Sequence, residues 1–236
     1  MEIKEQNFRK VEQLLHQAGY TLPELLIDSC KYNSRLLNIS EVYIKRCQQI
    51  YYKLDKDVLS RGEKGRLLEE LSGILFQKSV ENLFDVYRNC RTSTNEIDIL
   101  IRWTESARMG GISTVFSFIG DSFLCECKNY KGPVDVTYVG KFNSLMSVAD
   151  TYFGVMISWD GISGRNEWKD SKGLIKKIAL REKRYIVVLD KKDLKELCNG
   201  EKNIFSMLYD KYIALKNETD YDKYIVKHEA EEELLN

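Results

Sequence analysis

An acid and a lysine stand two positions apart in the segment Leu124–Lys128, which has the composition of a short β-strand. Because side chains alternate between the two faces of a strand, Glu126 and Lys128 project from the same face. Cys125 and Cys127 project from the other face, where we expect them to be small buried side chains. The sequence therefore predicts an acid and an amine side by side on an otherwise buried strand.

A second carboxylate lies upstream, in the strand-like segment 95–101. The same alternation places Asp98 on the face opposite to the core, which takes the three isoleucines Ile97, Ile99 and Ile101. An unpaired carboxylate between apolar residues is costly in free energy. We therefore expect Asp98 to have a partner, and a cation held between Asp98 and Glu126 would supply one.

The set of two acids and one amine suits the hydrolysis of a phosphodiester bond. Asp98 and Glu126 offer the hard oxygen ligands that Mg²⁺ or Mn²⁺ prefers, and the backbone carbonyl of Cys127 is a third candidate ligand. Lys128 would orient the attacking water and stabilise the negative charge that grows on the phosphate. Two simpler interpretations stay open: an exposed ion pair of Glu126 with Lys128 on an edge strand, and a turn or helix-capping role for Asp98.

Strands and helices alternate around these residues. Runs rich in β-branched and aromatic residues predict strands at 83–88, 96–103, 113–118, 123–128, 152–158 and 185–189. Amphipathic spacing predicts helices at 65–76, 136–149, 171–182 and 191–198, and a further helix after residue 201. A helix, a meander of strands and then alternating helices and strands are typical of an α/β fold, with a mixed β-sheet flanked by helices.

The chain divides into three regions by pattern. Residues 1–62 have apolar residues at helical spacing, and we expect a helical cap or adaptor that packs on the rest or docks a partner protein. Residues 63–200 hold the alternating strands and helices. Residues 201–236 are expected to form a C-terminal helix and an acidic tail, whose excess of acids is typical of a solvated terminus.

The order of these motifs resembles the PD-(D/E)xK nuclease superfamily, and most closely its Mrr-type restriction endonuclease-like branch. Gly65 and Glu69 lie on the first helix of the region, Asp98 on a strand, and Glu126-Cys127-Lys128 on the next strand. The resemblance covers about residues 63–200 and implies a restriction endonuclease-like fold with an N-terminal helical region before it. This sequence has Ile97 where the motif of the superfamily begins with proline, a departure that is common among relatives.

The resemblance implies a role for each of these residues. Asp98 and Glu126 correspond to the metal ligands, and Lys128 corresponds to the catalytic lysine. Glu69 corresponds to the helix acid that binds the metal or a bridging water, because its spacing from Gly65 fits the family better than that of Glu70. The family also implies Mg²⁺-dependent cleavage of DNA, and often dimerisation.

Basic residues that follow the second strand motif are candidates for contacts with DNA phosphates. The stretch 165–184 carries an excess of basic residues, with the candidates Lys169, Lys172, Lys176 and Lys177. Lys141, on the preceding helix, is a further candidate. A solvated helix face explains the same pattern equally well. The fourteen tyrosines are dispersed, and their spacing supports no argument for base stacking.

Composition excludes several classes of protein. The 36 basic and 36 acidic residues balance, so no global field favours nucleic acid or membranes. His16 and His228 are the only histidines, which argues against histidine-based catalysis and against a zinc site built on the two neighbouring cysteines. Six cysteines without paired spacing, no signal-peptide pattern and no long apolar run indicate a cytosolic protein that does not span a membrane.

We therefore predict a cytoplasmic, Mg²⁺-dependent endonuclease that hydrolyses DNA. By analogy it is a restriction or anti-phage defence effector that works with a partner protein or as a homodimer. Two alternatives stay open. One is a non-catalytic binding or assembly protein that keeps the fold, and the other is a nuclease that acts on RNA or on branched DNA.

Overall fold

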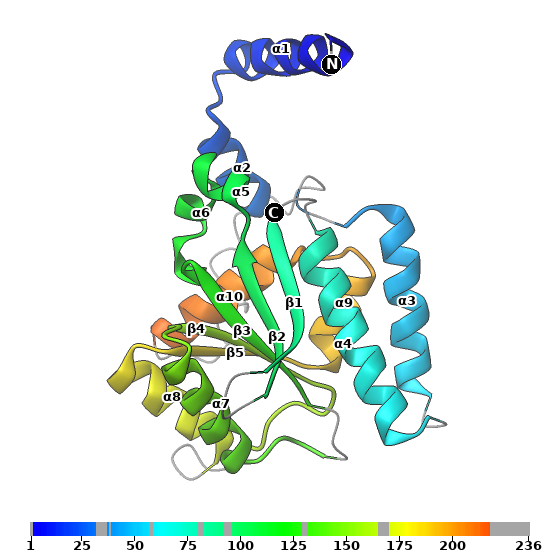
Figure 1. Ribbon diagram of the computed structural model, residues 1–236, viewed down its shortest axis with the longest axis vertical. Coiled ribbons are helices and arrows are strands. Elements are labelled where there is room, and N and C mark those ends of the chain that lie inside the picture. The colour runs from blue at the N-terminus through cyan, green and yellow to red at the C-terminus, as the bar shows by residue number, and fades with distance from the viewer. Residues whose placement is uncertain are drawn as a thin grey trace, which may run out of the picture.

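The computed structural model describes residues 2–31, 37, 39–56, 59–79, 83–91, 96–128, 132–164 and 170–217. Within these residues, five strands form a single mixed sheet in the order β1-β2-β3-β4-β5, and helices cover both of its faces (Figure 1). The predicted α/β fold class is therefore confirmed.

The strands are β1 (Phe84–Arg91), β2 (Glu96–Trp103), β3 (Ser122–Lys128), β4 (Phe153–Ser158) and β5 (Tyr185–Leu189). The pairs β1–β2 and β2–β3 are antiparallel, whereas β3–β4 and β4–β5 are parallel. All five agree with predicted strands to within one to three residues at either end, because runs of β-branched and aromatic residues mark them in the sequence.

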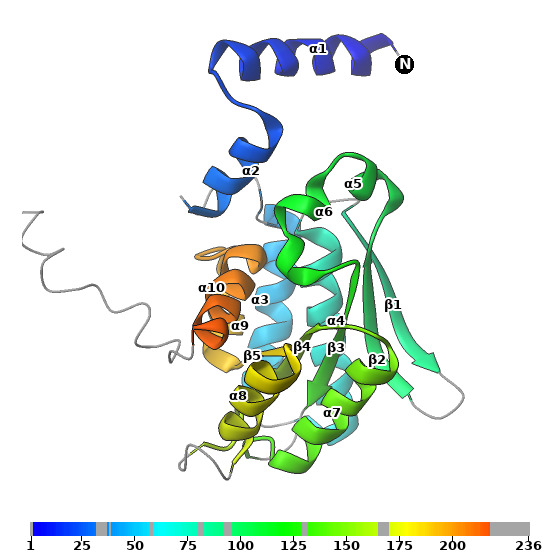
Figure 2. The same ribbon diagram turned by 90° about the vertical axis from the view of Figure 1, so that its left-hand side faces the viewer.

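Two layers of helices enclose the sheet. One layer contains α3 (Glu41–Asp55), α4 (Arg61–Lys78), α9 (Lys191–Cys198) and α10 (Ile204–Lys216). The other contains α7 (Val136–Val148) and α8 (Ser171–Glu182), which lie side by side (Figure 2). The larger apolar core lies under the first layer and the smaller core under the second, so both faces of β3 and β4 are buried.

Helix α4 begins at a capping box, in which Ser60 and Glu63 each accept the backbone amide of the other. Its predicted apolar stripe faces the sheet, with Leu68, Leu71 and Leu75 fully buried. The helix packs against β1, β2 and β3.

The N-terminal region is helical, as predicted, with α1 (Glu2–Gln17) and α2 (Leu22–Lys31) before α3. Helix α1 lies apart from the rest of the molecule in both views (Figures 1 and 2). Its apolar residues Phe8, Val11 and Leu14 are exposed. None of the described helices combines the length and the apolar content that a membrane crossing requires.

The strand predicted at 113–118 is wrong. After α5 (Glu105–Met109), the chain forms the short helix α6 (Ile112–Val115) and the 3₁₀ turn η2 (Ser117–Ile119). Gly111 and Gly120 flank this part at φ angles of 75° and 78°, in the left-handed region that favours glycine. The helical turns bring the apolar side chains into the core without a neighbouring strand.

The prediction that three isoleucines share one face of β2 is wrong for Ile97. Ile99 and Ile101 join the larger core, whereas Ile97 packs with Phe142 of α7 in the smaller one. The partner strand is distorted at this point, since Asn89 has a φ of 51° between the pairs Arg88↔Ile99 and Cys90↔Ile97. Cys90, which is opposite Ile97, packs against the same smaller core, so the change of side occurs on both strands at this point.

Candidate active site

Strands β2 and β3 part at Asp98. Their described pairing runs from Arg102↔Ser122 to Ile99↔Cys125, while β3 continues along β4 as far as Lys128↔Ser158. In the opening, the backbone amide of Cys127 donates a hydrogen bond of 2.9 Å to Oδ2 of Asp98. The amide of Cys127 therefore bonds to the side chain of Asp98 and not to a backbone carbonyl of β2. This bond holds the Asp98 carboxylate next to the end of β3.

Glu126 and Lys128 lie on the same face of β3 and form an ion pair. Their side chains are 11% and 18% exposed, respectively. Burial raises the pKa of Glu126, the nearby charge of Asp98 raises it further, and Lys128 lowers it. Glu126 is thus a carboxylate in surroundings that disfavour its negative charge, apart from one lysine.

Helix α4 supplies a third acid. The charge of Glu69 also raises the pKa of Glu126, by less than burial and the charge of Asp98 do. The neighbouring Glu70 points elsewhere, because its Oε1 accepts a hydrogen bond of 2.6 Å from Arg46 of α3. Of the two adjacent acids, only Glu69 acts on the charge of Glu126 in this structure.

The thiols of β3 belong to the opposite face. Cys125 is fully buried in the larger core, and burial raises the pKa of its thiol. The Sγ atom of Cys127 lies 3.2 Å from Oγ of Ser72 on α4. Both side chains are therefore packing residues, and what Cys127 brings to the site is its backbone. Its carbonyl as a metal ligand stays a prediction.

The donor chemistry of the site fits a hard divalent cation. Asp98, Glu126 and Glu69 carry oxygen ligands, and a cation would relieve the repulsion that raises the pKa of Glu126. Within the described residues, no group of three or more acids, cysteines or histidines is close enough to hold a metal. In this structure Glu126 is engaged in an ion pair with Lys128.

Tyr138, in the first turn of α7, stands beside the catalytic candidates. Asp135 caps this helix by accepting the amides of Thr137 and Tyr138. The amines of Lys128 and Lys141 lie 5.6 and 5.5 Å from the centroid of the Tyr138 ring. Sequence analysis missed Tyr138, although its spacing of three residues from Lys141 on a predicted helix was an available signal.

The remaining basic candidates lie elsewhere. Lys172 and Lys176 line a cavity of about 320 Å³ between α8, β5 and the end of α10, which they share with Asp160 and Asp190. Lys177 is exposed on α8, and Lys169 lies outside the described residues. Of the basic residues predicted to contact DNA, Lys141 is the one that the structure brings to the same ring as Lys128.

Comparison with known families gives one match. Residues 62–198 match a family model described as a restriction endonuclease, of the Mrr catalytic type. The matched range is more than half of the chain and includes the positions of Glu69 on α4, Asp98 on β2, and Glu126 and Lys128 on β3. No curated protein and no solved structure matches the chain.

Proposed function

Because the chain belongs to the Mrr-type restriction endonuclease family, we propose that it is a Mg²⁺-dependent endonuclease that hydrolyses DNA. The observation that carries the proposal is the position of the Asp98 carboxylate. It is bound to the amide of Cys127, between the two residues of the Glu126–Lys128 pair. Nuclease activity in general follows from the family, whereas the substrate, the metal and the role of each residue are the proposal.

In the proposed mechanism, Asp98, Glu126 and Glu69 hold the cation. When bound, Mg²⁺ (or Mn²⁺) acts as a Lewis acid that neutralises charge on the phosphate. Glu126 would leave its ion pair with Lys128 in order to serve as a ligand of the cation. The ammonium group of Lys128 then donates hydrogen bonds to the attacking water and to a phosphate oxygen, and it stabilises the negative charge of the transition state. The apolar residues around β3 keep bulk water away from these charges.

Nicking of supercoiled plasmid in Mg²⁺ tests the assignment. We expect Asp98→Asn to lower the rate by at least about 10³-fold and Glu69→Gln by about tenfold, because each removes a charged ligand. Glu70→Gln is the matched control and should stay within about twofold, since it removes only a partly exposed ion pair. Undiminished nicking by a correctly folded Asp98→Asn protein would refute the proposal.

A second candidate is a non-catalytic binding or assembly protein, favoured by the ion pair that occupies Glu126. Thermal unfolding with increasing Mg²⁺ or Mn²⁺ discriminates the two. A cation that binds only the folded state stabilises it by about 2.7 kcal/mol at one hundred times its Kd. The nuclease should show this increase, and Asp98→Asn should abolish it. A flat response of the wild-type protein would favour the non-catalytic candidate.

Substrate and biological role extend the proposal. Incubation with duplex DNA, single-stranded DNA, RNA and four-way junctions separates a DNA endonuclease from a nuclease for RNA or branched DNA. By analogy with the family, we propose a role in restriction or anti-phage defence. Preference for an RNA or junction substrate would replace the DNA assignment and leave the site unchanged.

Partner binding is proposed for the N-terminal region. We keep the division into an adaptor at 1–62, a nuclease domain at 63–200 and a C-terminal region at 201–236. On α1, the exposed Phe8, Val11 and Leu14 offer an apolar stripe to a helix of a partner protein. Light scattering that gives twice the chain mass of 27.6 kDa would instead identify a homodimer.

A further inference from the structure

Two lysine amines approach the ring of Tyr138, one from the candidate catalytic strand and one from the same helix. We propose that Tyr138 is a positioning residue of the nuclease site. Its ring keeps the amine of Lys128 on the scissile phosphate and the amine of Lys141 on the neighbouring phosphate of the same strand. The inference rests on the proposed function and assigns to it a residue outside the acid and lysine motif.

Lys128 needs a second partner during the reaction. In the structure its amine is paired with Glu126, the carboxylate that we propose to bind the cation. If Glu126 held a cation, its attraction for the amine of Lys128 would be weaker. An aromatic ring face attracts an ammonium group independently of that carboxylate. With the ring centroid 5.6 Å away, Tyr138 can hold Lys128 in place when the ion pair opens.

The amine of Lys141 lies 5.5 Å from the centroid of the same ring. Lys141 follows Tyr138 by three residues on α7, so the two side chains are neighbours on the helix surface. The side chain of Lys128 is only 18% exposed, whereas Lys141 is exposed to solvent. The two amines therefore lie at different depths along one path. A nucleic-acid strand with one phosphate at Lys128 brings an adjoining phosphate toward Lys141.

The backbone of Tyr138 is fixed where this task requires it. Its amide donates a hydrogen bond of 3.3 Å to the capping carboxylate of Asp135, and its side chain is half-buried beside the smaller core. A ring on a capped first turn has little freedom to follow a moving lysine. Tyr138 therefore positions the amines of Lys128 and Lys141. A flexible side chain at this position would not hold them in place.

Steady-state cleavage of a duplex in Mg²⁺ tests the inference with matched variants. Tyr138→Phe keeps the ring and should stay within about twofold of wild type in kcat and KM. Tyr138→Leu should lower kcat at least about tenfold, because a small misplacement of a reacting group is costly, and it should also raise KM. Lys141→Gln should raise KM by about three- to tenfold and spare kcat, because it removes one phosphate contact. The controls Tyr209→Leu and Lys195→Gln, on other helices, should change neither parameter.

A second comparison isolates the electrostatic attraction of the ring. Pentafluorophenylalanine at position 138 nearly keeps the shape of phenylalanine but removes the negative charge of the ring face. We expect its kcat to fall at least about fivefold below that of Tyr138→Phe, at an unchanged melting temperature. This comparison decides the question even if Tyr138→Leu fails to fold. Equal rates for the two aromatic variants would overturn the inference.

The outcomes separate this inference from the proposed function. If wild type cleaves DNA and a folded Tyr138→Leu protein matches it in kcat and KM, the positioning role is wrong and the nuclease assignment stands. If wild type neither binds nor cleaves any nucleic acid in Mg²⁺ or Mn²⁺, the proposed function itself is wrong. A fall of kcat in Tyr138→Leu that Tyr138→Phe does not share supports both.

Discussion

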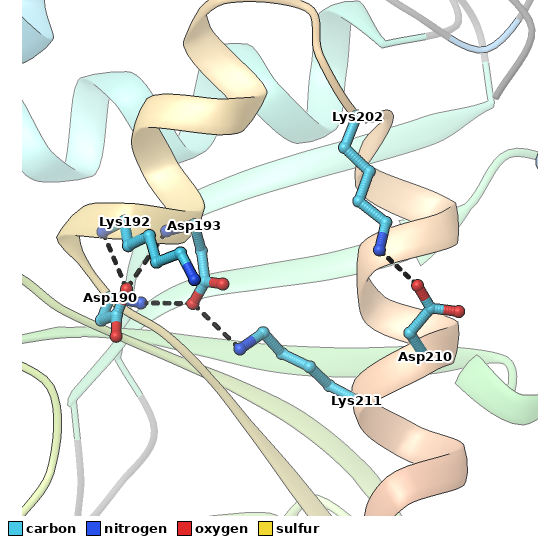
Figure 3. Close-up of polar contacts among 6 residues, drawn as sticks. All are labelled: Asp190, Lys192, Asp193, Lys202, Asp210 and Lys211. Atoms are coloured by element: carbon cyan, nitrogen blue, oxygen red, sulfur yellow. Dashed lines mark hydrogen bonds and ion pairs between the residues drawn. The ribbon is translucent and has the colours of Figure 1, made fainter. Parts of the chain in front are cut away.

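Glu126 on β3 and Asp193 on α9 are both nearly buried carboxylates paired with a lysine. Their side chains are 11% and 7% exposed, and those of their partners, Lys128 and Lys211, are 18% and 14% exposed. Burial is the first cause that raises the pKa of both acids. Figure 3 shows the second pair, in which Lys211 of α10 extends toward Asp193 at 3.0 Å.

The surroundings of the two carboxylates differ in the hydrogen-bond donors and the charges that they offer. Asp193 accepts the backbone amide of Asp190 at 2.8 Å, and Asp190 in turn caps α9 by accepting the amide of Asp193 (Figure 3). The charge of Asp190 raises the pKa of Asp193, but the bond to the Asp190 amide and the charge of Lys211 lower it. The pKa of Glu126 is raised by two negative charges, those of Asp98 and Glu69. A buried acid that serves the fold has hydrogen-bond donors within the fold. A buried acid beside two other acids is a candidate for binding a cation, and this difference supports the role proposed for Glu126.

The largest expected difference between the two ion pairs is in the rate of DNA cleavage after the lysine of each pair is replaced. Lys128→Met should lower the rate by about 10²- to 10³-fold, because the charge that stabilises the transition state is lost. Lys211→Met should stay within about threefold when it is assayed well below its melting temperature, since Lys211 pairs with a residue of the fold. Equal losses in plasmid nicking for the two variants would erase the distinction.

In Mg²⁺, Lys211→Met should lose more stability than Lys128→Met, the reverse of their order in cleavage. Lys211→Met leaves the buried Asp193 without its cation, which should lower the free energy of unfolding by about 3 kcal/mol, with or without Mg²⁺. Lys128→Met should gain more from Mg²⁺ than wild type does, because the metal no longer competes with an ammonium group for Glu126. Thermal melts across a Mg²⁺ titration measure both. If Mg²⁺ restored the stability of Lys211→Met, the distinction between the two ion pairs would be contradicted.

A smaller effect is expected in the pH dependence of stability. The pKa of Asp193 is raised above 3.8 in the folded protein, so its contribution to stability falls as pH rises from that value through the folded pKa. Lys211 lowers this pKa, and its loss should raise the pKa further, at about 1.4 kcal/mol for each unit. The destabilisation of Lys211→Met should therefore be smaller at about pH 5 than at about pH 7.5.

Melting temperatures of wild type and Lys211→Met at the two pH values check this sign. A Lys211→Met/Asp193→Asn double variant is the control, because it has no carboxylate to protonate and should show no such difference. A penalty that grows on acidification would mean that Asp193 is not the group that responds.

Local patterns were sufficient for much of the fold. The limits of β2, α8, β5 and α9 follow from runs of β-branched residues and from apolar spacing. In the structure, Asp170 and Asp190 cap α8 and α9. Each of these signals acts within a few residues, so tertiary contacts do not alter it. The segment at 113–118 failed because its apolar residues fit a strand equally well. Only the glycine turns and the lack of a neighbouring strand made it helical.

The sequence alone was sufficient to propose site residues on β2, β3 and α4. It also determined that Glu126 and Lys128 share one face of β3, because alternation along a strand is a property of the backbone. Tertiary structure decided what those residues meet. It parted β2 from β3 so that Asp98 binds the Cys127 amide, it separated Glu69 from Glu70, and it placed Tyr138 beside Lys128. Electrostatic and ring contacts act through space between segments far apart in the chain. Their partners are therefore fixed only when the sheet and its helices pack.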